Sequence, residues 1–286
     1  MYRVLRKLPL FINISKHRYS TKNNELINNL KKAIKVTGPI SIAQYMREVL
    51  TNSHGGYYMA GDVFGRGGDF VTSPEISQIF GELIGIWFLT QWQSQGKPDK
   101  IQIVELGPTK ASIALTGSLA YEKFKIGDRI EISPDSMKIS KQIAKHIKDN
   151  GGASLIIDYG QDFMQGNTLR AIKRHEFVHP LSEPGQTDLS ADVNFCYLKE
   201  SVTDLAYLLL VDTYGPITQS KFLQSLGIKA RLSMLLKNAL PAQRKDLISS
   251  TERLVHPSAM GEIYKVLAFV SKGSLDAPVA FEKSKD

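Results

Sequence analysis

The sequence is poor in cysteine: Cys196 is the only one among its 286 residues. One thiol excludes an internal disulfide, and with six scattered histidines the chain shows no spacing of zinc ligands. We therefore expect no metal site. Because Cys196 lies in the apolar stretch DVNFCYL, we expect it to pack in the interior rather than to act as a nucleophile.

Long apolar runs are also absent. One of the longest, LIGIWFL at residues 83–89, is far too short to cross a bilayer. We therefore expect a protein that does not span a membrane. With 42% hydrophobic and 22% charged residues, the composition is that of a globular protein, and its length suits one large α/β domain with or without an appendage.

Acidic residues are missing from the first 24 positions. Basic residues alternate there with apolar ones, at Arg3, Arg6, Lys7, Lys16 and Arg18. This pattern predicts a mitochondrial transit peptide over residues 1–20, and the alternative is a first amphipathic helix of the domain. Removing residues 1–20 lowers the net charge from +8 to +3, and no basic stripe is interleaved with aromatic residues. We therefore expect no nucleic-acid partner.

Two helices are predicted before residue 94. The first lies within residues 37–52, with Ser41 as N-cap, and the second covers residues 73–93, with Ser73 as N-cap and Pro74 at the first helical position. Between them, residues 53–77 hold six glycines, which is typical of ordered loops.

Strands and helices alternate in the following part of the chain. Strands are expected at IQIVEL (101–106) and ASLIIDYG (153–160), with a further candidate at DRIEIS (128–133). A helix is expected over residues 134–152, and mostly helical structure over residues 220–239. The continuous apolar run at 153–160 is typical of a strand in the middle of a parallel sheet, so we predict an α/β fold with a doubly wound sheet.

Two acids, Glu105 and Asp158, lie at the carboxyl ends of predicted strands, where ligands bind in open α/β sheets. They can hydrogen-bond the hydroxyl or amino groups of a ligand, and Gly107 lets the backbone approach it. Capping of neighbouring helices is the alternative role for such acids. A NAD-dependent oxidoreductase needs a G-x-G-x-x-G turn, which GPTKAS at residues 107–112 does not provide.

Seven motifs stand in order along the chain: GPISIAQYMREVLTN, GGYYM, GDFVTSPEISQIFGELIGIW, VELGP, GGASLIIDYG, PGQTDLSADVNF and GPITQSKFLQSLGI. By these motifs the chain resembles the MidA family of mitochondrial protein arginine methyltransferases, which serve as complex I assembly factors. The resemblance covers most of residues 37–230. It implies a class I fold that binds S-adenosyl-L-methionine (SAM), and formation of symmetric dimethylarginine on a complex I core subunit in the mitochondrial matrix.

The resemblance also implies the site residues. SAM is expected to bind at the loop of Glu105, Gly107 and Pro108, with an adjoining lid that contributes Asp69, Thr72 and Ser73. Asp158 is the candidate catalytic carboxylate, because a charged guanidinium needs a carboxylate to orient it. Asp188 and Asp192 are further candidates near the acceptor, for which a capping or turn role is the stronger alternative.

The sequence departs from the family after VELGP. Thr109 and Lys110 replace further glycines, and a left-handed conformation at Thr109 would cost about 1–2 kcal/mol. The family's ribose-binding acid and the strand that carries it have no counterpart here. Glu131 in RIEIS imitates that acid but belongs with the later family segment, so a deletion is predicted from about Lys110 to about Leu119. A deletion that removes strands should expose apolar edges of the sheet.

Four regions are therefore expected: a transit peptide (1–20), a helical and lid segment (21–93), a shortened SAM methyltransferase-like domain (94–272) and a loose tail (273–286). The predicted function is that of a SAM-dependent protein arginine methyltransferase. The alternative is a catalytically inactive, shortened homologue that acts as a binding or assembly factor. A shortened splice product, a faulty gene model and a true short paralogue all remain open, as does the oligomeric state.

Overall fold

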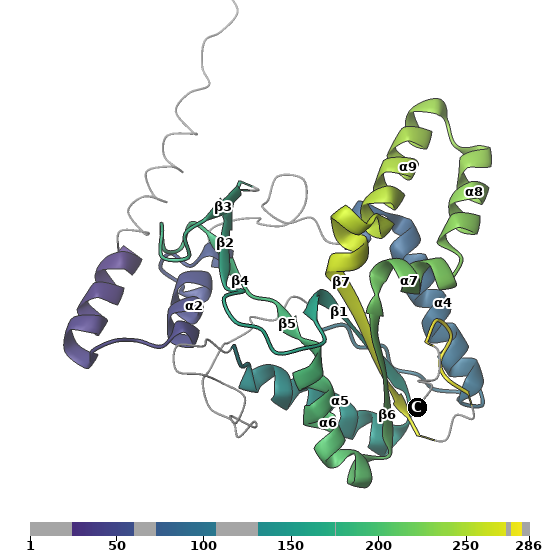
Figure 1. Cartoon of the computed structure of the whole chain (residues 1–286), viewed down its shortest axis with the longest axis horizontal. Helices are drawn as coiled ribbons and strands as arrows, with labels where there is room; N and C mark the ends of the chain where they lie inside the picture. Colours follow the sequence, from purple (N-terminus) through teal and green to yellow (C-terminus); the bar gives the residue numbers. More distant parts are fainter. Residues whose placement is uncertain (1–24, 60–72, 107–130, 175, 273–275, 282–286) are drawn as a thin grey trace, which may run out of the picture. The chain divides into compact units, whose positions relative to one another are not determined.

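The structure, a computed structural model, describes residues 25–59, 73–106, 131–174, 176–272 and 276–281. The chain divides into two compact units. Of the described residues, the small unit comprises 25–59, 169–174 and 176–191, and the large unit comprises 73–106, 131–168, 192–272 and 276–281. Figure 1 labels the elements of both.

The small unit packs helices against a short sheet. A helix over residues 25–37 and α2 (Ile42–Thr51) precede the 3-10 turn η1 (Tyr57–Met59). The sheet has the order β3-β2-β4, formed by β3 (Glu176–Val178), β2 (Arg170–Lys173) and β4 (Asp188–Ser190). The predicted N-cap Ser41 is confirmed, because its side chain accepts a hydrogen bond of 3.1 Å from the Gln44 amide.

The large unit holds a mixed sheet with the order β5-β1-β7-β6. Its strands are β1 (Ala153–Gln161), β5 (Val193–Asn194), β6 (Val211–Thr218) and β7 (Tyr264–Ser271). The central strand β7 runs antiparallel to both β1 and β6, whereas β5 runs parallel to β1.

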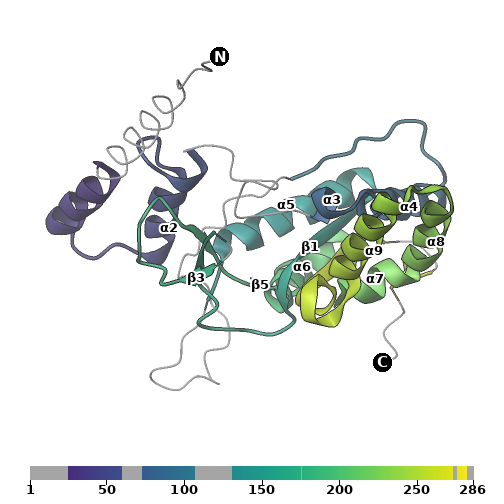
Figure 2. The ribbon, with the colours of Figure 1, turned by 90° about the horizontal axis from the view of Figure 1, so that it is seen from above.

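Helices cover both faces of this sheet. Alternate β7 residues, Val266, Ala268 and Val270, pack against one helical group, while Leu267 and Phe269 pack against another. The first group contains α4 (Gln78–Ser94), α7 (Gln219–Ser225), α8 (Ile228–Asn238) and α9 (Pro241–Val255), and the second contains α5 (Pro134–Asn150) and α6 (Phe195–Leu209). Figure 2 shows this layering from above. The predicted doubly wound α/β fold is confirmed.

The strand at 153–160 is confirmed, but its predicted place in the middle of a parallel sheet is wrong. One edge of β1 pairs antiparallel with β7 along Ala153–Tyr159, while β5 pairs with the other edge only at Gly160 and Gln161. A continuous apolar run indicates that both faces of a strand are covered, and carries no information on its two edges.

Other elements differ from expectation in ways that the sequence explains. The helix predicted over 73–93 is two helices, α3 (Ser73–Ile76) and α4, because the side chain of Ser77 caps α4 by accepting from the Ile79 amide at 3.3 Å. The described residues 131–133 of the candidate strand DRIEIS are not a strand. The helices expected near 134–152 and 220–239 are confirmed as α5, α7 and α8.

The described part of the C-terminal tail is anchored rather than loose. Phe281 is 5% exposed and packs in the core of the large unit. The Trp87 indole nitrogen donates to the Val279 carbonyl at 3.0 Å. These contacts fix residues 276–281 against α4, which the polar composition of the tail did not predict.

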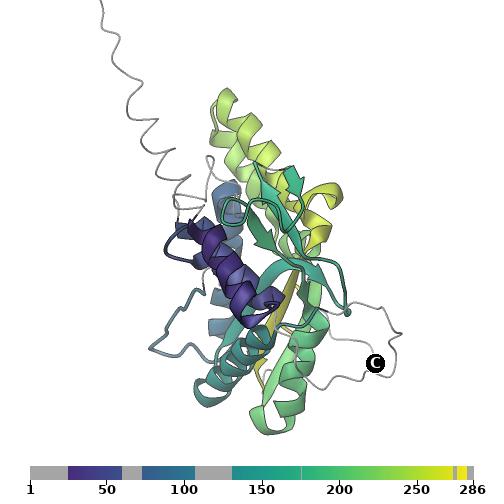
Figure 3. The ribbon, with the colours of Figure 1, turned by 90° about the vertical axis from the view of Figure 1, so that its left-hand side faces the viewer.

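The segment 101–106 lies outside the sheet, so the predicted strand there is wrong. Its four apolar side chains are mostly exposed, from 56% at Leu106 to 79% at Ile103. Figures 2 and 3 draw the stretch that follows α4 as a bare ribbon that loops away from the sheet and helices of the large unit. The apolar side chains of this segment, which a strand inside a sheet would bury, are therefore exposed.

Candidate functional site

The carboxyl end of β1 is the place where the fold brings polar groups together. Asp158 lies two residues before Gly160, and its Oδ1 accepts a hydrogen bond of 2.8 Å from the Tyr159 amide. By strand alternation Asp158 shares a face with Ile156, which packs toward α5 and α6. Gly160 is required by close packing, because a Cβ there would lie 2.0 Å from the Val193 carbonyl oxygen of β5.

A hydrogen-bonded network ties three separate segments together beside this end. Oε1 of Glu131 accepts from the Thr168 amide at 2.9 Å, and Oε2 accepts from the Thr168 hydroxyl. The Thr168 hydroxyl oxygen in turn accepts from the Asp192 amide at 3.0 Å. The network therefore fixes the entry to α5 and the start of β5, which makes Glu131 a structural residue rather than a ribose ligand.

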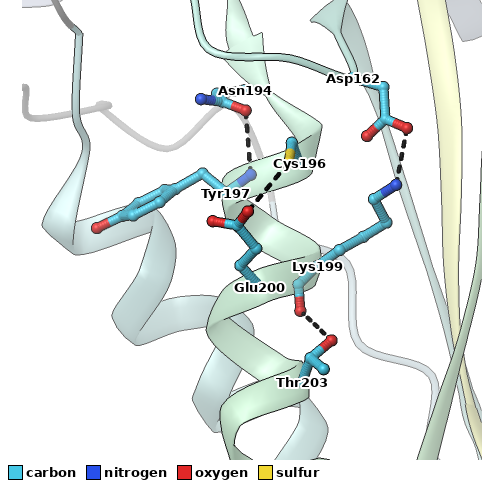
Figure 4. A network of polar contacts seen from close by, with 7 residues as sticks. All are labelled: Asp162, Asn194, Cys196, Tyr197, Lys199, Glu200 and Thr203. Carbon is cyan, nitrogen blue, oxygen red and sulfur yellow. Dashed lines mark hydrogen bonds and ion pairs between the residues drawn. The ribbon is translucent and has the colours of Figure 1, made fainter. Parts of the chain in front are cut away.

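An ion pair closes the loop after β1. Nζ of Lys199 on α6 lies 2.7 Å from Oδ2 of Asp162, as Figure 4 shows. Asn194 caps the first turn of α6, since its Oδ1 accepts from the Tyr197 amide at 3.0 Å. The Asp162 charge is thus compensated within the fold, and α6 is held against the end of β1.

Cys196 occupies the same region without the features of a nucleophile. Its thiol lies 3.3 Å from Oε1 of Glu200, one helical turn further on. Burial raises the pKa of the Cys196 thiol, and the Glu200 carboxylate raises it further. A raised pKa disfavours the reactive thiolate, so the prediction that Cys196 is no nucleophile agrees with its surroundings. Cys196 is partly exposed rather than buried as expected.

The residues predicted to bind SAM do not meet within the described part of the chain. Glu105 is exposed on the segment that lies outside the sheet, and Ser73 is 8% exposed at the start of α3. Gly107, Pro108, Asp69 and Thr72 lie outside the described residues.

The remaining candidate acids have structural partners. Asp188 is buried in the small unit, where its Oδ1 accepts a hydrogen bond of 2.7 Å from the Tyr58 hydroxyl. Asp192 contributes its amide to the network of Thr168. Asp188 therefore lies in strand β4 and shows no capping role, and the contact of Asp192 involves its backbone amide rather than its carboxylate.

The described residues therefore fit SAM only in part. The end of β1 offers a carboxylate, Asp158, next to a glycine at which backbones approach closely. The second predicted acid, Glu105, lies on a segment that pairs with no described strand. Within the described ranges no group of three or more histidine, cysteine or acidic side chains could hold a metal ion.

The ion pair of Asp162 with Lys199 and the network of Thr168 were not predicted from the sequence. Asp162 follows the strand by one residue, so its position was visible, but its partner on α6 lies 37 residues further along the chain. Pairings over such separations depend on tertiary structure. The requirement for glycine at position 160 arises in the same way, from the β5 backbone.

Comparison with known proteins identifies similar sequences. Residues 109–211 match a family model described as an S-adenosyl-L-methionine-dependent methyltransferase. The mitochondrial protein arginine methyltransferase NDUFAF7 of Xenopus tropicalis is 30% identical, with 91% of this chain and 89% of the relative covered. Its counterparts in Danio rerio and Homo sapiens are each 29% identical, and cover 93% and 86% of this chain.

Solved structures agree on the fold. A protein from Burkholderia thailandensis, crystallised with S-adenosyl-homocysteine, superposes with a TM-score of 0.68 at 20% identity, over 91% of this chain and 95% of its own. At this identity the likeness concerns the fold alone.

The alignments also reveal missing residues. The alignment with the Danio rerio relative extends over 390 positions, whereas 93% of the 286 residues of this chain is only about 266. About 120 positions of the aligned region therefore have no counterpart in this chain, which agrees with an internal deletion.

Proposed function

Because the chain belongs to the NDUFAF7/MidA family of SAM-dependent methyltransferases, we propose that it is a protein arginine methyltransferase. The family membership is the observation that carries this proposal. The proposed product is symmetric dimethylarginine on a complex I core subunit, and the proposed compartment is the mitochondrial matrix, since the relatives are named mitochondrial. No described helix combines the length and apolarity that a membrane span requires.

SAM, when bound, supplies a methyl group on a positively charged sulfonium. The tasks of the protein in such a transfer are positioning and electrostatics. Asp158 is the proposed catalytic carboxylate, because it can orient the guanidinium of the acceptor. The fixed end of β1, held by the Asp162–Lys199 ion pair and the network of Thr168, supports the precise placement that this role demands.

The test uses the full-length protein with SAM carrying a labelled methyl group and a soluble mitochondrial extract as acceptor. The proposal expects label in dimethylarginine after acid hydrolysis, with loss of at least tenfold in the Asp158→Asn variant. Asp149→Asn, which removes an exposed carboxylate at the end of α5 and before the start of β1, serves as the control for a general change of charge. Absence of label in arginine derivatives from the wild-type protein would contradict the proposal.

A second candidate function is favoured by the position of Glu105 outside the sheet and by the missing positions. In this alternative the chain is a catalytically inactive homologue that binds the complex I subunit as an assembly factor. Capture of that subunit by the full-length protein, unchanged by SAM and accompanied by no methylation, would favour this alternative over the first.

A further inference from the structure

Along Ala153–Tyr159 one edge of β1 pairs with β7, and among the described residues no strand pairs with the other edge before Gly160, where β5 begins to pair. We call the stretch of this second edge before Gly160 the open edge of β1. The side chains on this stretch are only partly buried. An open edge next to apolar side chains is a site at which a further strand adds readily.

The segment 101–106 has the properties of the missing strand. Its side chains alternate, with Ile101 and Ile103 on the side of Glu105, and Val104 and Leu106 on the other side. Both sides are thus apolar, as expected for a strand that is covered on both faces. All four apolar side chains are more than half exposed in the described position, so docking would remove them from water.

The chain tethers this segment at the correct end of β1. Oε1 of Gln95, the C-cap residue of α4, accepts a hydrogen bond of 2.8 Å from the amide of Gly152, which directly precedes β1. Only residues 96–100 separate this contact from Ile101, and connections of two to six residues are usual between a helix and the next strand. A strand that starts there can run parallel to β1.

We propose that residues 101–106 dock along the open edge of β1 as an additional parallel strand. If Ile101 lies beside the start of β1, Glu105 comes level with the region of Ile157 and Asp158. The two acids that the sequence places at strand ends are then brought to the same edge of the sheet. This state would be specific to the shortened chain, in which β5 pairs with that side of β1 only at Gly160 and Gln161 among the described residues.

Tethering favours the segment over other occupants of the edge. A short linker holds it at an effective concentration on the order of millimolar. A second copy of the chain, or an extended segment of a partner, would have to compete at micromolar concentration. The docking itself does not depend on the proposed function.

Hydrogen–deuterium exchange of the full-length protein tests the proposal. Undocked, the exposed amides of 101–106 exchange at the chemical rate, so docking should slow them by about tenfold or more. Val104→Pro, which removes one amide and blocks pairing, should abolish this protection. Val104→Thr keeps the backbone amide and a β-branched side chain, so the protection of residues 101–106 from exchange should be retained. Because the Val104 side chain is 63% exposed, neither change removes a contact of the folded core.

Three outcomes are distinguishable. Protection that is independent of protein concentration, lost in Val104→Pro and kept in Val104→Thr, supports the proposal. Exchange at the chemical rate in the wild-type protein overturns it. Protection that grows with concentration, together with dimers in light scattering, overturns it in favour of a second copy. Calorimetry with S-adenosyl-homocysteine separately tests the proposed function, so that failure there with a protected segment leaves the docking intact.

Discussion

The anchored tail gives the most quantitative test of the structure. Phe281 packs against Phe222, Tyr214 and Trp87, with ring centroids 5.8, 6.4 and 6.4 Å away. Truncation of a buried phenylalanine to alanine costs about 3–5 kcal/mol, through lost burial and the cavity left behind. For a unit of this size, each kcal/mol shifts the melting temperature by about 2–4 °C. Phe281→Ala should therefore melt at least about 6 °C below the wild-type protein.

The assay is thermal unfolding followed by tryptophan fluorescence. The buried Trp87 reports directly on this contact, and the chain has only two tryptophans. Phe163→Ala is the matched control, because Phe163 is 58% exposed in the same unit and its truncation should change stability by about 0.5 kcal/mol or less. Equal melting temperatures for the two variants would refute the packing of the tail.

Three further predictions follow from single contacts. Gly160→Ala should lower the urea midpoint, because its Cβ meets the Val193 carbonyl, whereas Gly85→Ala, with open space around its Cβ, should not. A hydrogen bond from Arg231 lowers the pKa of Glu82 below its ordinary 4.5. The ionised Glu82 therefore stabilises the folded protein above pH 4.5, and this contribution is lost as the pH falls through the lowered pKa of the folded state. Glu82→Gln should therefore flatten the acid limb of a stability–pH curve, and an unchanged slope would contradict this pairing. Glu200→Gln should accelerate alkylation of Cys196, because it removes one cause of the raised thiol pKa; an unaltered rate would leave burial as the whole explanation.

The sequence predicted the elements better than their pairing. The Ser41 cap, helix α5 and strand β1 were predicted correctly. The features that indicate them, hydrophobic periodicity and capping residues, are visible within a few neighbouring positions of the sequence. The partners of β1 were beyond such reasoning. Its antiparallel pairing depends on β7, more than 100 residues further along the chain, and its short parallel pairing depends on β5.

In the candidate site too, the position of a residue along the chain was predicted better than its neighbours in the fold. Asp158 was found from its place at the end of an apolar run, and it lies at the end of β1 as expected. Glu105 was found by the same reasoning, yet the residues 101–106 that carry it pair with no described strand. A strand needs hydrogen-bonding neighbours as well as a suitable sequence, and the pattern IQIVEL specifies only the latter.

The central claim is that this shortened chain still belongs functionally to the SAM-dependent methyltransferases. Its most direct test is a calorimetric titration of the full-length protein with S-adenosyl-homocysteine, alongside the Glu105→Gln variant. We expect micromolar binding by the wild-type protein and at least tenfold weaker binding by the variant. No binding heat from the folded wild-type protein would contradict this claim, whereas equal affinity in both proteins would exclude Glu105 from the binding site.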